Sequence, residues 1–116
     1  MSQSARNTAI PPTSSEVRIV RGEGGLSQEE AEARLHREGY HEAFRWYDVP
    51  GATYPSHHHS QDECVWVLKG EIHFEISGQV YELRAGDRLY LPAGAPHTAK
   101  VPRIEGVTYL IGRRTA

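Results

Sequence analysis

The amino-acid sequence predicts an all-β protein, a sandwich or a barrel, with one short helix near its N-terminus. Most segments after residue 43 alternate apolar and polar residues with the period of two that is typical of half-buried strands. Glycine or proline residues separate these short segments, which is the pattern of sandwiches and barrels. The length of 116 residues fits one domain. With 38% hydrophobic and 24% charged residues, the composition is that of an ordinary soluble protein.

Charge and hydropathy exclude several classes of partner. The formal net charge of -2 gives no basic surplus for nucleic-acid binding. No apolar run approaches the roughly 20 residues of a membrane span, and residues 1–8 lack the apolar stretch of a signal peptide. We therefore expect a cytoplasmic protein that binds neither nucleic acid nor membrane. The single cysteine, Cys64, excludes an internal disulfide, and we expect it to be a packed thiol rather than a nucleophile.

The first part of the chain divides into two segments. Residues 1–16 are rich in Ser, Thr, Asn and Pro and are expected to form a flexible N-terminal arm. Residues 17–41 are expected to form a strand and helix segment that packs on the main body. A weak alternation predicts the strand at 17–20, and the glycines of 22–25 interrupt it.

A capping motif marks the helix, which we expect at residues 27–38. Ser27 and Glu30 form the S-x-x-E capping box, and Gly39 is a natural end. Ala31, Leu35 and Ala33 supply only a narrow apolar side, so the helix should lie on the surface of the main body. Two histidines in this region, His36 and His41, are expected to be solvated.

Residues 42–116 should form the β-rich body. The segment 71–76 alternates polar and apolar residues strictly, and the turn at 77–79 makes it the first half of a hairpin. His73 lies on the polar side of this segment and is expected to face solvent. We expect strands at 44–49, 63–68, 71–76, 80–83, 88–91, 97–101 and 106–111.

The histidine run at residues 57–59 is the strongest indication of a functional site. In an extended strand His57 and His59 point the same way, Glu63 shares their parity, and His58 points to the other face. A third imidazole has to come from another strand, where His97 and His73 are the histidines left in the β-rich half. Neutral imidazoles with a carboxylate suit a divalent transition metal ion: Fe, Mn, Ni, Co, Cu or Zn.

Two segments resemble the two conserved motifs of the cupin superfamily, in its small single-domain conserved-barrel form. The first motif is matched at Gly51, His57, His59, Glu63 and Gly70. The second is matched at Gly86, Pro92, Gly94 and His97, and Val101 stands where the motif has Asn. The resemblance implies an antiparallel jelly-roll barrel, also called a double-stranded β-helix. It also implies one divalent metal ion held by His57, His59, Glu63 and His97.

Four protein ligands leave up to two positions open on an octahedral metal. The expected function is therefore a metal-dependent enzyme, of the dioxygenase type, acting on a small organic molecule that coordinates the metal. The alternatives are a cupin isomerase or decarboxylase, and a non-catalytic cupin that binds or senses a small molecule or metal. A closed zinc site that only stabilises the fold is a further alternative.

No catalytic residue is assigned, because no second carboxylate is clearly available inside the barrel: Glu75 and Glu82 are on the wrong face or ambiguous. Aromatic residues are the candidates for substrate contacts: Tyr54, Phe74, Tyr90 and Tyr109.

A homodimer is expected as well. Trp66 and Leu68 have outward parity, so either the helix or a second subunit must cover them. The resemblance also implies pairing, since cupins commonly pair as dimers through their sheets.

Overall fold

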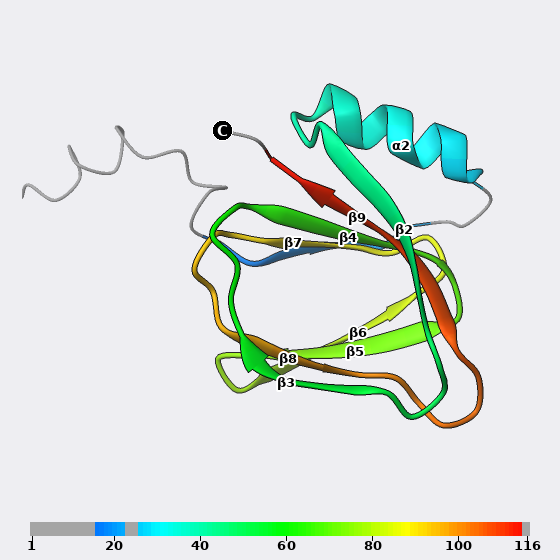
Figure 1. Cartoon of the computed structure of the whole chain (residues 1–116), viewed down its shortest axis with the longest axis vertical. Helices are drawn as coiled ribbons and strands as arrows, with labels where there is room; N and C mark the ends of the chain where they lie inside the picture. The colour runs from blue at the N-terminus through cyan, green and yellow to red at the C-terminus, as the bar shows by residue number, and fades with distance from the viewer. Residues whose placement is uncertain (1–15, 23–25, 115–116) are drawn as a thin grey trace, which may run out of the picture.

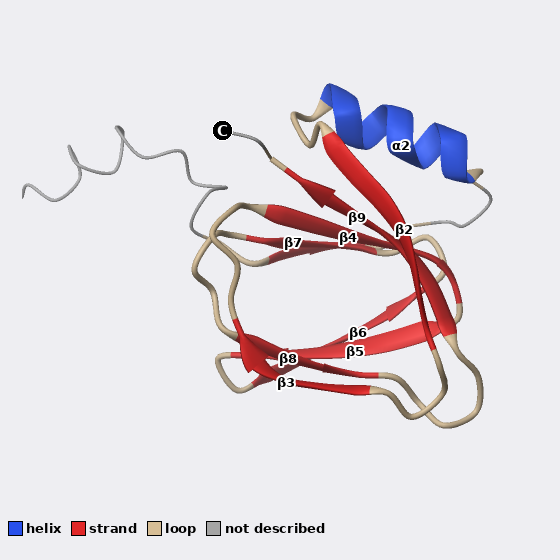
Figure 2. Ribbon diagram, viewed as in Figure 1, coloured by secondary structure: helices blue, strands red, loops and turns tan. Residues whose placement is uncertain are grey.

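The structure is a computed structural model that describes residues 16–22 and 26–114. Its strands form two antiparallel sheets that face each other, with a helix outside one of them (Figures 1 and 2). The elements are β1 Arg18–Val20, α2 Gln28–Arg37, β2 Glu42–Asp48, β3 Thr53–His57, β4 Glu63–Lys69, β5 Glu71–Ile76, β6 Gln79–Arg84, β7 Arg88–Leu91, β8 His97–Lys100 and β9 Val107–Arg113. The flexible arm expected at 1–16 lies outside the described residues, apart from Glu16.

The strand order is that of a jelly roll. One sheet has five strands in the order β1-β7-β4-β9-β2, and the other has four in the order β3-β8-β5-β6. The chain crosses from one sheet to the other after β2, β3, β4, β6, β7 and β8, and every neighbouring pair is antiparallel. The predicted all-β fold with a short helix is confirmed. In the described part of the chain, no helix is long and apolar enough to cross a membrane.

The main core lies between the two sheets. In β5 the side chains of Ile72, Phe74 and Ile76 are buried while Glu75 is exposed, as the strict alternation predicts. Val65 and Val67 meet them from β4 in the facing sheet. Burial of apolar area at about 25 cal/mol per Å² is the main force that holds the two sheets together.

Gly70 links β4 to β5 at a place where only glycine fits. Its φ of 89° lies in the left-handed region, and a Cβ atom there would stand 2.3 Å from the carbonyl oxygen of Gly106. The second glycine of the first motif, Gly70, is therefore required by the crossing between the sheets, not by the chemistry of the site.

Helix α2 covers the outer face of the five-stranded sheet. Its buried residues Ala31 and Leu35 pack in a second cluster with Tyr40, Cys64, Trp66, Tyr90 and Leu110. The predicted capping box is present: Ser27 Oγ accepts from the Glu30 N–H at 3.1 Å, and the Ser27 N–H donates to Glu30 Oε1 at 2.9 Å. The expectation that Ala33 joins the apolar side was wrong, because its side chain is exposed.

Replacement of the central helix residue tests this packing. Leu35 is fully buried, so Leu35→Ala should lower the free energy of unfolding by about 2 to 5 kcal/mol. Urea denaturation followed by far-UV circular dichroism measures it. Arg37→Ala, at an exposed position of the same helix, should stay within about 0.5 kcal/mol of the wild type. Equal losses in the two variants would contradict the packing.

The reactivity of the Cys64 thiol gives an independent measure of how completely α2 covers this face of the sheet. Burial raises the pKa of its thiol to about 12, so the reactive thiolate is scarce at neutral pH. We expect the native protein not to react with Ellman's reagent at pH 8, and to release one equivalent of chromophore in 6 M guanidinium chloride. Rapid reaction without denaturant would show that α2 leaves this face open.

Candidate metal centre

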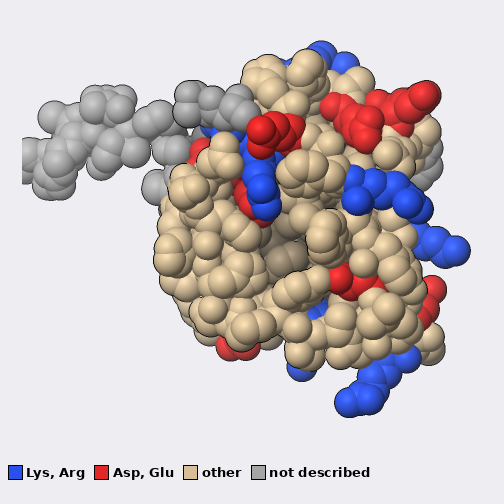
Figure 3. Space-filling model, in the orientation of Figure 1, with Lys and Arg blue, Asp and Glu red and all other residues tan. Residues whose placement is uncertain are grey.

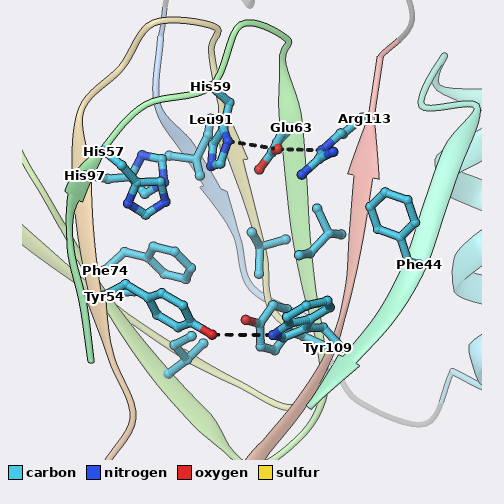
Figure 4. A pocket seen from close by; sticks show the side chains of 15 residues that line it. Phe44, Tyr54, His57, His59, Glu63, Phe74, Leu91, His97, Tyr109 and Arg113 are labelled. Carbon is cyan, nitrogen blue, oxygen red and sulfur yellow. Dashed lines mark hydrogen bonds and ion pairs between the residues drawn. The ribbon is translucent and has the colours of Figure 1, made fainter. Parts of the chain in front are cut away.

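Three histidines converge at one end of the space between the sheets (Figure 4). His57 on β3 and His97 on β8 are paired in register, and their ring centroids lie 4.5 Å apart. The ring of His59 lies 4.9 Å from that of His57 and 5.2 Å from that of His97. One ring nitrogen from each histidine falls in a group whose members all lie within 4.8 Å of one another.

The backbone reaches this arrangement differently from the sequence prediction. Strand parity was expected to align His57, His59 and Glu63, but β3 ends at His57, and Glu63 begins β4 in the opposite sheet. The position of His59 is therefore set by the loop between these strands and not by strand parity. His58 is exposed, as expected.

Hydrogen bonds between two loops hold His59 in place. The Gly94 N–H donates to the His59 carbonyl oxygen at 2.8 Å, and the Ala93 N–H donates to Asp62 Oδ1 at 2.8 Å. Gly94 adopts a φ of 84°, in the left-handed region that favours glycine. The two motifs are thus joined by direct bonds, so the loop carrying His59 and the loop preceding His97 are positioned together.

Hydrogen bonds and burial favour the neutral imidazole forms that bind a metal. His57 Nδ1 lies 2.8 Å from the Pro55 carbonyl oxygen, and His97 Nδ1 lies 2.9 Å from the Ala95 carbonyl oxygen. A carbonyl oxygen only accepts, so each Nδ1 carries the proton and each Nε2 keeps a free lone pair. Burial lowers the pKa of both His59 and His97, which favours the neutral form that binds metal.

Glu63 lies beside His59, outside the group formed by the three histidine nitrogens, and is held by an arginine. Its side chain is buried, with Oε2 at 3.5 Å from His59 Nδ1 and at 2.8 Å from Arg113 Nε. Glu63 and Arg113 are direct register partners on β4 and β9. Arg113 was missed because β9 was expected to end at residue 111. The parity of Tyr109, Ile111 and Arg113 along one strand could have indicated it.

This donor set fits a divalent transition metal ion. His57, His59 and His97 each offer a neutral imidazole nitrogen at short range, and Glu63 is the fourth candidate ligand from the facing sheet. Three nitrogen ligands with a carboxylate suit Fe, Mn, Ni, Co, Cu or Zn better than Ca²⁺ or Mg²⁺.

A cavity of about 200 Å³ opens from the histidines into the barrel. Tyr54, Phe74 and Tyr109 are among the residues that line it, and Figure 4 shows the two tyrosines at the end away from the histidines. The other lining residues are Phe44, Trp46, His57, His59, Glu63, Val65, Ile72, Leu91, His97, Ala99, Ile111 and Arg113. The face of the molecule drawn in Figure 3 has a hollow in its middle, with mainly uncharged surface around it.

Tyr90, the fourth aromatic candidate, lies elsewhere. It belongs to the cluster beneath α2, where its hydroxyl donates to Glu38 Oε1 at 2.6 Å. The reason is strand alternation in β7: Leu89 and Leu91 face the main core, so Tyr90 faces outward. Tyr90 therefore does not line the cavity at the histidines, contrary to what was expected of a substrate contact.

A second carboxylate, not identified from the sequence, lies behind the two tyrosines at the far end of the cavity. Asp48 at the end of β2 is buried and accepts hydrogen bonds from the hydroxyls of Tyr54 and Tyr109, the latter at 2.6 Å, and from Trp46 Nε1 at 3.1 Å. Phe44, Trp46 and Asp48 share one face of β2, so the alternation in this strand contained the signal. Burial and the bond to Asp48 raise the pKa of Tyr54 and of Tyr109.

The comparisons with known proteins agree with this geometry. A family model described as "Cupin domain" matches residues 44–110. The chain belongs to the cupin family. No curated protein sequence matches this cupin.

Several solved structures are similar to this cupin. The DMSP lyase DddQ from Ruegeria pomeroyi DSS-3 is 30% identical over 62% of this chain and 36% of that chain, with a TM-score of 0.58. A cupin protein from Bacteroides fragilis is 25% identical over 64% of each chain, with a TM-score of 0.56. The polyketide cyclase RemF from Streptomyces resistomycificus shares the fold at 20% identity, over 61% of this chain and 52% of that chain, with a TM-score of 0.56. The chain thus spans about a third of the lyase.

Adjacent histidines provide a matched test of the metal centre. His59→Ala removes a ligand and should weaken binding of Zn²⁺ or Co²⁺ by about 100-fold or more, since loss of an outer-shell partner alone costs 10- to 100-fold. His58→Ala changes an exposed neighbour and should bind the metal as the wild type does. Isothermal titration calorimetry gives both affinities. Equal affinities in the two variants would remove His59 from the ligand set.

Proposed function

We propose that this cupin is a metal-dependent enzyme acting on a small organic molecule that coordinates the metal through oxygen atoms. The observation that carries the proposal is the convergence of three imidazoles on one end of an apolar cavity, beside a buried carboxylate. A divalent metal bound there would supply Lewis-acid or redox chemistry. His57, His59, Glu63 and His97 would hold it.

The size and lining of the cavity limit the substrate. About 200 Å³ is below the roughly 300 to 1,000 Å³ of pockets for drug-sized ligands, so the substrate is a small metabolite. Apolar side chains from both sheets, such as Ile72, Phe74 and Ile111, contact its carbon skeleton and exclude water. Phe44 and Trp46 line the cavity and are 40% and 49% exposed, so the cavity is open to solvent along β2, including the end near Tyr54 where Trp46 lies.

The first reaction class is a dioxygenase-type oxidation. It is supported by the predominance of apolar groups around the histidines, because an apolar cavity admits dioxygen and protects reactive species from water. The role of the chain's own residues is to position the substrate: Phe74 and Leu91 bound the space next to the imidazoles.

A second class, non-oxidative chemistry as in an isomerase, decarboxylase or lyase, is favoured by the hydrogen bond between Tyr54 and Asp48. Tyr54 donates its hydroxyl proton to Asp48, so the phenol could accept a proton at its oxygen while passing its own proton to that carboxylate. The similarity to a DMSP lyase also supports this class.

Oxygen consumption separates the two classes. The protein loaded with Fe²⁺ or Mn²⁺ is offered diketones, catechols, thiols and flavonols in an oxygen electrode, and an oxygenase should consume oxygen with at least one of them. His59→Ala should abolish the uptake and His58→Ala should retain it. Absence of uptake with the whole panel at full metal loading would contradict the oxygenase. Turnover that persists under nitrogen, followed by mass spectrometry, would establish the non-oxidative class.

A binding or sensing role without turnover is the remaining alternative. It predicts that an unmodified small molecule stays bound through purification, which native mass spectrometry would detect. The homodimer also remains a proposal. Because α2 covers Trp66, the outer face no longer requires a second copy, and the proposal rests on the resemblance to other cupins. A monomeric mass by light scattering at micromolar concentration would contradict it.

A further inference from the structure

A negative charge without a paired cation lies behind the tyrosines at the end of the cavity opposite the histidines. Asp48 is 7% exposed, and its hydrogen-bond donors, Trp46, Tyr54 and Tyr109, are all neutral. Among the ion pairs of the described residues, none includes Asp48. A buried charge is normally paired with an opposite charge or a metal. This one has neither in the described part of the chain.

The two tyrosines face the cavity as hydrogen-bond acceptors. A hydroxyl has one proton to donate, and both Tyr54 and Tyr109 give theirs to Asp48. Burial raises the pKa of both phenols, and the bond to Asp48 raises it further, so the protons stay in place at neutral pH. The Tyr54 oxygen also accepts from Trp46 Nε1 at 3.4 Å. A phenolic oxygen has two lone pairs, so a lone pair remains on each tyrosine to attract a positive or proton-bearing group.

The walls at this end are aromatic. Trp46, Tyr54 and Tyr109 all line the cavity, and Trp46 lies opposite Tyr109 in register on β2 and β9. The face of an aromatic ring attracts a cation, most strongly when the ring is tryptophan. Rings, phenolic oxygens and the carboxylate behind them therefore favour the same kind of ligand group.

The other end of the cavity has the opposite preference. The three imidazoles there suit a dication, and Arg113 lines the cavity beside Glu63. A metal there would attract an anionic oxygen group, while the guanidinium of Arg113 is paired with Glu63 and balances its charge. The cavity is therefore polarised along its length, with the tyrosine end negative and the histidine end able to hold positive charge.

We infer that the ligand of this cavity is a small zwitterion, with a carboxylate at the histidine end and an ammonium or other onium group held by Trp46, Tyr54, Tyr109 and the charge of Asp48. The inference rests on the proposed function for the histidine end alone. The tyrosine end needs no metal, so the two can be tested separately.

A purely structural role for Asp48 makes a different prediction. Its bonds tie the end of β2 to β3 and β9, so Asp48 could serve only to fasten an edge strand. In that case replacement of Asp48 would lower stability and weaken all ligands alike. A ligand-binding role requires that the preference for positive charge itself depends on Asp48.

Matched pairs of compounds measure this preference. Glycine betaine and its homologues with one and two further methylene groups carry a trimethylammonium group and a carboxylate. Each is compared with the neutral-tailed compound in which carbon replaces nitrogen, starting with 3,3-dimethylbutanoate. Calorimetry with the zinc-loaded full chain should show that the best betaine binds about tenfold more tightly than its isostere.

Two variants locate the preference. Asp48→Asn keeps the shape but removes the charge, and it should reduce the ratio between betaine and isostere to less than about threefold. Trp46→Leu, at a half-exposed position, should also reduce the ratio without loss of folding. Tyr47→Leu is the control, because Tyr47 is exposed on the next position of β2 and does not line the cavity. Its ratio should be that of the wild type.

The metal-free protein distinguishes failure of this inference from failure of the proposed function. Tetramethylammonium should shift the indole N–H resonance of Trp46 in a nuclear magnetic resonance titration, with no metal present. If this shift occurs but zinc does not tighten binding of the betaines, the onium end stands and the proposed metal enzyme fails. Equal binding of betaine and isostere by the wild type, or an unchanged ratio in Asp48→Asn, would overturn the inference. Absence of any binding by the cation and the betaines would overturn it too.

Discussion

The register between β3 and β8 is the constraint on which the site depends. It places His57 directly opposite His97, so one pair of hydrogen-bonded strands brings together two imidazoles from residues 40 positions apart. Because side chains alternate along a strand, a slip of one residue would turn one of these rings out of the barrel. A register shift between Tyr54 and His57 shows that the strand bends locally while this pair is kept. The bonds between Gly94 and His59 fix the third imidazole relative to the same two strands.

The motifs were predictable because their spacing is local and each residue has a separate physical requirement. Gly70 and Gly94 need a left-handed backbone, and the histidines need a common direction. The reason given for that direction was only partly correct. His59 lies in a loop, and the parity argument reached the right pair because the loop happens to return its side chain to the same space as His57.

The far end of the cavity was not predictable from the motifs, because it is assembled from strands that meet only in the fold. Asp48 comes from β2, Tyr54 from β3 and Tyr109 from β9, and their proximity follows from the strand order of both sheets. The sequence shows by alternation that Phe44, Trp46 and Asp48 lie on one face of β2, but it does not show that this face is turned toward the cavity. The error for Tyr90 has the same origin, since both faces of the five-stranded sheet are covered and an aromatic residue fits on either.

The position of β2 explains why one residue can both fasten the barrel and act on a ligand. An edge strand pairs on one side only, so its end needs side-chain bonds to stay attached, and Asp48 supplies two of them, to Tyr54 of β3 and Tyr109 of β9. Neutral donors satisfy the hydrogen-bonding capacity of the carboxylate but not its charge. Both carboxylate oxygens accept hydrogen bonds, Oδ1 from Trp46 and Tyr54 and Oδ2 from Tyr109, so an asparagine, which accepts through one atom only, could not satisfy all three donors. The buried charge that results carries a desolvation cost. A cation at the tyrosine end would offset that cost, which links the stability of the edge strand to the charge of the ligand.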